Sequence, residues 1–192
     1  QRMLLELAWE ALEDAGLPPA SLRGGKMGVF IGISLSDYGM LLADDLSQTD
    51  AHAATGTSLC LAANRLSFLF GWQGPSLALD TACSSSLVAV HLACHHIHRG
   101  ECEAAVAGGT SLLLSPVGSV NLTKAGFCAP DGRVRAFDAQ ASGYVRGEGA
   151  GLVGGEAEGE LAVGDGEVVE GLFGAVDLAG LEDRGGEGEG GV

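Results

Sequence analysis

Short runs of apolar, β-prone residues alternate along this chain with segments in which apolar residues recur at helical spacing. The β-prone runs occupy residues 26–34, 75–82, 103–114 and, with many glycines, 142–153. The helical spacing extends over residues 2–15, 58–71 and 84–99. Because polar and apolar residues do not alternate in the runs, we expect strands that are covered on both faces. Strands that alternate with helices predict an α/β layered sheet.

The connecting segments carry weaker signals. Residues 36–57 are mixed in character and predict a loop with short helical pieces, and residues 129–134 ("APDGRV") predict a turn. The paired glycines Gly108 and Gly109 interrupt the third run, which predicts a close approach of another backbone or helix at that point.

Charge divides the chain into two parts. Residues 154–192 contain eight Glu and three Asp against one Arg, so they carry −10 of the net charge of −15. Thirteen of these 39 residues are glycine, and we interpret the segment as a divergent Gly/Glu-rich tail that follows a domain at 1–153. The acidic balance argues against nucleic-acid binding.

Two further features bear on location. The sequence contains no run of 18 uninterrupted apolar residues, so we expect no membrane span. Its five cysteines are an odd number and most lie in apolar or helical patterns, which is typical of a reduced, cytoplasmic protein rather than a disulfide framework.

The stretch "ALDTACSSSLVAVHLA" (78–93) places Cys83 where a predicted strand passes into a predicted helix. The first N–H groups of a helix lack intrahelical partners, and the positive end of the helix dipole favours a thiolate. We therefore predict that Cys83 is a nucleophile, that backbone N–H groups at Cys83 and Ser84 support a developing oxyanion, and that the serines at 84–86 cap the helix. The alternative is a buried structural cysteine.

The segment "DTACSSSLVAVHLA" resembles the active-site signature of β-ketoacyl synthases, specifically the condensing domains of modular polyketide synthases. Other segments resemble the same family in the same order. They are "QRMLLELAWEALEDAG", "GVFIGISLSDYG", "AANRLSFLFGWQGPS", "CEAAVAGGTSLLLSP", "AGFCAPDGRVRAFD" and "GYVRGEGAG". The resemblance covers residues 1 to about 153 and is only faint in the tail, where "GDGEVVEGLFGAV" occupies the place of a strand.

The resemblance implies the N-terminal half of a thiolase-like, layered αβαβα fold that usually forms a homodimer. It implies that Cys83 takes an acyl chain from the phosphopantetheine arm of an acyl carrier protein, with no bound cofactor or metal. A malonyl-type extender, loaded by an acyltransferase domain of the same synthase, would then condense with the thioester by decarboxylation.

The family's two histidine motifs, "HGTGT"-like and "NxGH"-like, do not occur in this sequence. The five histidines, His52, His91, His95, His96 and His98, all precede the place where those motifs belong. We therefore expect this chain to acylate its cysteine but not to condense. The alternatives are a fatty-acid-type condensing enzyme and a non-catalytic remnant that serves only dimer or carrier-protein contacts.

The run "CHHIH" suggests a metal site, because His91, Cys94 and His98 share one helical face at i, i+3 and i+7. No distant ligand completes the set, so we expect an ordinary, partly polar helix instead. In that interpretation His91 and Cys94 lie in the interior, and the other three histidines of the helix lie near solvent.

Overall fold

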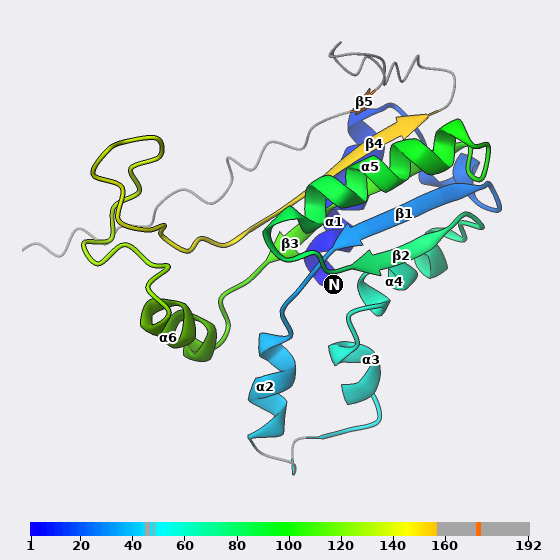
Figure 1. Cartoon of the computed structure of the whole chain (residues 1–192). Helices are drawn as coiled ribbons and strands as arrows, with labels where there is room; N and C mark the ends of the chain where they lie inside the picture. The colour runs from blue at the N-terminus through cyan, green and yellow to red at the C-terminus, as the bar shows by residue number, and fades with distance from the viewer. Residues whose placement is uncertain (45–46, 48, 157–171, 174–192) are drawn as a thin grey trace, which may run out of the picture.

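The computed structural model describes residues 1–44, 47, 49–156 and 172–173. These residues form a five-stranded sheet in the order β2-β1-β3-β4-β5 (Figure 1). The strands are β1 (Met27–Gly32), β2 (Ser76–Leu79), β3 (Ala104–Ser111), β4 (Gly149–Glu156) and β5 (Leu172–Phe173). Strand β1 pairs in parallel with β2 and β3, whereas β4 runs antiparallel to β3 and β5.

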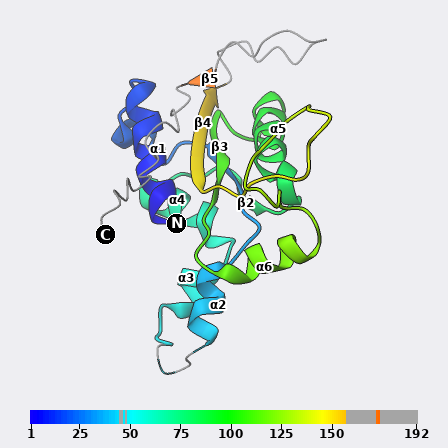
Figure 2. The same ribbon diagram turned by 90° about the vertical axis from the view of Figure 1, so that its left-hand side faces the viewer.

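Helices cover both faces of this sheet, as Figure 2 shows. Helices α1 (Arg2–Asp14) and α4 (Leu61–Phe70) cover one face, and α5 (Ser85–His98) covers the other. Alternate residues of β1 enter two separate cores: Val29 and Ile31 pack with α1 and α4, and Phe30 packs with α5. The α/β fold predicted from uninterrupted apolar runs is thus confirmed, because each strand needs apolar residues at successive positions to fill both cores.

The helices bury the residues that recur at helical spacing. Helix α5 buries Ser85, Ala89, Ala93 and Ile97 against the sheet, and α1 buries Leu4, Ala8, Ala11 and Leu12. Small alanines on these stripes let the helix axes lie close to the strands. Glycines with left-handed φ follow the helices, at +66° for Gly16, +71° for Gly71 and +69° for Gly100, as their position after each helical segment indicates.

Three further helices lie beyond the carboxyl ends of the parallel strands (Figure 1). Helices α2 (Asp37–Ala43) and α3 (Ala53–Thr57) are the short pieces expected within 36–57. Helix α6 (Pro116–Lys124) was not predicted. Its start carries a recognisable signal, since Pro116 occupies the first turn and the Ser115 hydroxyl accepts a hydrogen bond from Val117 N.

The fourth strand begins and ends later in the sequence than predicted. Residues 142–148 are not in a strand, and β4 continues past residue 153 to Glu156. Strand β5 pairs with Gly154 and Gly155, and it lies inside the "GDGEVVEGLFGAV" stretch. The rest of the predicted tail, 157–171 and 174–192, lies outside the described residues.

None of the helices in the described part of the chain has the length and apolar character needed to cross a bilayer.

Candidate active site

The strand-to-helix junction predicted around Cys83 is present at the carboxyl end of β2. There, β1, β2 and β3 end side by side, with Gly32 of β1 in register with both Leu79 and Gly109. A single 3-10 turn, Ala82–Ser84, connects the segment after β2 to α5, and Cys83 lies exposed in it. The alternative of a buried structural cysteine is therefore wrong.

Hydrogen bonds hold this turn in an unusual backbone conformation. Ala82 has a left-handed φ of +56°, which costs a residue with a Cβ roughly 1–2 kcal/mol. Its N–H donates to Asp80 Oδ1 at 2.9 Å, and its carbonyl accepts from Ser85 Oγ at 2.7 Å. Ser85 Oγ also accepts from Thr81 N at 2.9 Å, and Ser84 Oγ donates to the Thr81 carbonyl at 2.8 Å. These bonds offset the strain and hold the turn that presents Cys83.

The prediction that the serines cap α5 is wrong. Ser84 occupies the N-cap position, but its φ of −92° and ψ of −1° are helical, and its hydroxyl makes no capping bond. A capping side chain needs an extended backbone to reach the next N–H groups. The hydroxyls of Ser84 and Ser85 instead hydrogen-bond back to residues 81 and 82, so they fasten the cysteine turn rather than the helix end.

Asp80 is the charged member of the turn. The N–H of Ala82, and then the Ser34 hydroxyl, hydrogen-bond its carboxylate and hold its pKa below the ordinary value. Ser34 Oγ also lies 3.4 Å from Ser85 Oγ. The segment after β1 thus contacts both ends of the cysteine turn, which places Cys83 relative to the sheet.

Glycines bring the first turn of α5 directly onto the sheet. A Cβ at Gly32 would lie 2.7 Å from Ser86 N, and a Cβ at Gly109 would overlap the Ser86 hydroxyl. A Cβ at Gly108 would overlap the Gly151 carbonyl oxygen of β4. The close approach predicted from the paired glycines is confirmed, and it brings the start of α5 onto the ends of β1 and β3.

Asp37 and Ser115, which the sequence analysis did not assign to the site, meet at the same edge of the sheet. Asp37 is 4% exposed, and its Oδ2 accepts a hydrogen bond from Ser115 N at 3.1 Å. Its Oδ1 is buried and has no hydrogen-bond partner in the described part of the chain. The sequence does carry a signal for this pair, because both residues follow soon after a buried strand, and residues that follow parallel strands gather at the carboxyl edge of the sheet.

Glu148 and Arg146 fasten the segment before β4 to the segment after β3. Glu148 Oε1 accepts from Leu113 N at 2.6 Å, and Arg146 donates to Ser119 Oγ at 2.8 Å. The chain segments that follow β1, β2 and β3 and precede β4 therefore all lie at the edge that carries Cys83.

The histidines of α5 do not converge on a site. His91 is exposed, so the prediction that it lies in the interior is wrong; Cys94 is half-buried, and burial raises the pKa of its thiol. Across residues 1–44, 47, 49–156 and 172–173, no group of three or more His, Cys, Asp or Glu side chains is placed to hold a metal ion.

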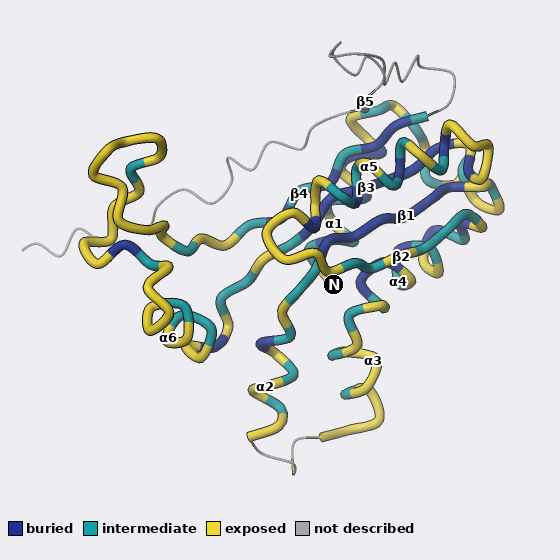
Figure 3. The backbone as a smooth tube through the Cα atoms, viewed as in Figure 1, coloured by how far each residue is buried: buried dark blue, intermediate teal, exposed yellow. Residues whose placement is uncertain are grey.

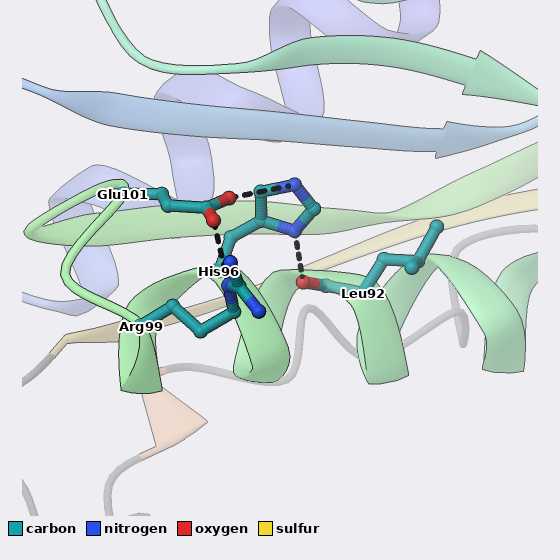
Figure 4. A network of polar contacts seen from close by, with 4 residues as sticks. All are labelled: Leu92, His96, Arg99 and Glu101. Carbon is teal, nitrogen blue, oxygen red and sulfur yellow. Dashed lines mark hydrogen bonds and ion pairs between the residues drawn. The ribbon is translucent and has the colours of Figure 1, made fainter.

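His96, predicted near solvent, has a side chain that is only 19% exposed, whereas His91, His95 and His98 are exposed. Figure 4 shows the polar contacts of the His96 ring. Its Nδ1 lies 2.8 Å from the Leu92 carbonyl oxygen and therefore donates to it, and its Nε2 lies 3.3 Å from Glu101 Oε2. The ring centroid is 4.9 Å from that of Phe30. Arg99 Nε donates to Glu101 Oε1 at 2.7 Å and, as the largest cause, lowers the pKa of Glu101. This network ties the end of α5 to the chain that enters β3.

The five cysteines differ in their surroundings. Cys60 and Cys83 are exposed, and Cys128 is half-buried. Cys102 is 1% exposed in the core under α5, where burial raises the pKa of its thiol to about 11. Cys102 therefore stays protonated at neutral pH, and exposure separates Cys83 from three of the other four thiols.

Comparison with known proteins places these features in a family. Residues 1–154 match the family model described as the N-terminal domain of β-ketoacyl synthase. Two different subunits of the phenolphthiocerol/phthiocerol polyketide synthase of Mycobacterium tuberculosis are similar to the chain, one with 53% identity over 153 residues and the other with 51% identity over 155 residues. These matches cover 80% of this chain but only 8% and 7% of the two relatives.

The solved structures that align with this chain are also ketosynthases. An oxazolomycin ketosynthase domain of Streptomyces albus aligns with a TM-score of 0.73 and 44% identity over 79% of this chain and 27% of that domain chain. The ketosynthase from module 6 of the Bacillus subtilis bacillaene synthase aligns with a TM-score of 0.71 and 38% identity, over 80% of this chain and 26% of its own. The chain thus spans about a quarter of the solved ketosynthases that it matches.

Proposed function

The chain belongs to the β-ketoacyl synthase family and carries the N-terminal domain of that enzyme in the form found in polyketide synthases, and on this basis we propose that Cys83 accepts an acyl group as a thioester. The observation that carries the proposal is the exposed position of Cys83 in a hydrogen-bonded 3-10 turn between β2 and α5, directly after Ala82 with its left-handed φ. Because the thiol is exposed, the carbonyl carbon of an acyl donor can reach its sulfur without a rearrangement of the fold.

The reaction proposed for this chain is one acyl transfer. The Cys83 sulfur, having given its proton to solvent, attacks the carbonyl carbon of an acyl thioester and forms a new C–S bond. Backbone N–H groups at Cys83 and Ser84 support the negative oxygen of the tetrahedral intermediate. That intermediate collapses with cleavage of the original C–S bond, and the departing thiolate takes up a proton.

The donor we propose is the phosphopantetheine thiol of an acyl carrier protein. In the complete synthase the acyl-cysteine then condenses with a malonyl-type extender, in a homodimeric domain beside an acyltransferase domain. The histidine motifs that the family uses for that second step do not occur in this sequence, so the proposal for the 192 residues ends at the acyl-enzyme.

Two other functions were considered for this chain, and different observations bear on each. A fatty-acid-type condensing enzyme would use the same cysteine, but the relatives cited above are polyketide synthases and ketosynthases. A non-catalytic remnant that contacts only carrier proteins or a second copy would require an unreactive Cys83. The exposed thiol and the intact turn around it favour the acyl acceptor.

An acylation experiment tests the proposal. The chain is incubated with an acyl-phosphopantetheine thioester, and the acylated residue is located by peptide mass spectrometry. We expect one acyl group on Cys83, none after Cys83→Ala, and unchanged acylation after Cys60→Ser, which removes the other exposed cysteine. Iodoacetamide should likewise modify Cys83 well before Cys60. Slow and equal modification of both thiols would favour the remnant instead.

A further inference from the structure

An open groove lies between α1 and α4, on the face of the sheet opposite α5. Its volume is about 390 Å³. The apolar lining residues are Leu5 and Trp9 of α1 and Leu69 and Phe70 of α4, and the acidic ones are Glu6, Glu10 and Glu13 of α1. Neither Cys83 nor any residue of its turn lines this groove, so its role is separate from the proposed acyl transfer.

The floor of the groove is apolar, partly exposed and firmly supported. Trp9 is 48% exposed and Leu69 is 50% exposed. The Trp9 ring lies 6.4 Å from that of Phe70, which is buried and stacks on buried Trp72 at 4.6 Å. Exposed aromatic rings on a rigid base are the side chains that most often anchor a protein partner.

The rim of the groove is acidic. Glu6, Glu10 and Glu13 follow one another at i, i+4 and i+7 along α1, and all three are exposed. In the part of the chain that the structure describes, no cation forms an ion pair with any of them. Like charges at this spacing repel one another and weaken a helix. A cationic ligand would remove that repulsion.

We propose that this groove binds a cationic amphipathic helix of a partner protein. Its apolar side chains, spaced at i, i+3 or i+4 and i+7, would pack on Trp9 and Leu69, and Lys or Arg beside them would face the glutamates. A second copy of this chain docked symmetrically would bring the same three glutamates against themselves. The Gly/Glu-rich segment 154–192 has a net charge of −10, which is the wrong sign for a ligand of this acidic rim.

Binding of a synthetic peptide to the full chain tests this proposal. The probe carries Leu along one helical face and Lys along both flanks; one control has Glu in place of Lys, and another has the probe's composition in scrambled order. Titration calorimetry gives the affinity. Tryptophan emission locates the site, since Trp9 loses water on binding and shifts to shorter wavelength while Trp72 is already buried.

Matched charge variants decide the outcome. We expect Glu6→Lys/Glu10→Lys to weaken binding of the Lys peptide by roughly tenfold or more, and Glu6→Gln/Glu10→Gln to give a smaller loss. Asp44→Lys/Glu103→Lys changes the net charge equally outside the groove and should leave the affinity unchanged. Added salt should weaken binding, because exposed charges are screened.

Three results would overturn the proposal. The first is equal binding of the Glu or scrambled peptide. The second is equal affinity of the Lys peptide for the protein and for both groove variants. The third is a dimer, seen by sedimentation, that the groove variants dissociate, since the occupant would then be a second copy.

Discussion

The body of the sheet and the segments at its carboxyl edge are built in different ways (Figure 3). The body, with α1, α4 and α5, is held by two apolar cores that alternate strand residues fill. The edge segments, with α2, α3 and α6, are mostly exposed and are joined by single hydrogen bonds such as Asp37 to Ser115 and Glu148 to Leu113. Apolar packing stabilises this molecule, and polar contacts position the site residues.

Truncation of a core leucine should have the largest effect. Leu66 of α4 is fully buried, so Leu66→Ala removes apolar contacts and leaves a cavity, at a cost of about 2–5 kcal/mol in the free energy of unfolding. The same change at Leu114, which is 45% exposed at the edge, should cost less than about 1 kcal/mol. Urea denaturation measures both. Equal losses would mean that the edge packs as tightly as the body.

A methyl group where α5 meets the sheet should have the next largest effect. In Gly109→Ala the new Cβ overlaps Ser86 Oγ and lies 2.7 Å from the Gly32 carbonyl oxygen, so we expect a loss of about 1–3 kcal/mol. The change also displaces the start of α5, and acylation of Cys83 should slow with it. Gly149→Ala in β4 is the control, because no atom lies within 4 Å of its Cβ. If Gly109→Ala left the free energy of unfolding unchanged, the start of α5 would be able to move away from the sheet at little cost.

Removal of the Asp37 carboxylate should loosen the edge while sparing the body. Asp37→Ala leaves the Ser115 N–H without its acceptor, which we expect to cost about 1–2 kcal/mol. Limited proteolysis should then cut faster within 36–57 and 116–124, and hydrogen exchange of β1 and β3 should stay unchanged. Faster exchange throughout the sheet would instead place Asp37 among the groups that stabilise the body.

The smallest expected effect concerns pH and the network at the end of α5. The folded-state pKa of Glu101 is lowered, first by Arg99, so its contribution is present above the unfolded-state pKa and is lost as the pH falls through the folded-state value. The stability difference between the wild type and Glu101→Gln should therefore shrink on acidification. Urea melts of both proteins at several pH values measure this trend. A difference that stays constant with pH would mean that the ion pairs contribute nothing.

Local pattern predicted most of the body and the place of Cys83. The helices α1, α4 and α5 follow from apolar spacing, and β1, β2 and β3 follow from apolar runs, because each is encoded by near neighbours in the chain. Prediction was weakest where the backbone is held by individual side chains. Helix α6 was missed, and the strand expected from residue 142 begins only at Gly149, after the segment that Glu148 and Arg146 fasten to the loop after β3 and to α6.

The sequence by itself determined the α/β alternation, the thiol at the end of a strand, and the resemblance to β-ketoacyl synthases. Only the tertiary structure decided that Asp37 binds Ser115, 78 positions away, that His96 rather than His91 turns inward, and that Trp9 and three glutamates form one groove with α4. The physical reason is the distance along the chain over which each kind of interaction acts. Spacing and propensity act over a few residues, whereas these contacts form only after the sheet has brought distant segments together.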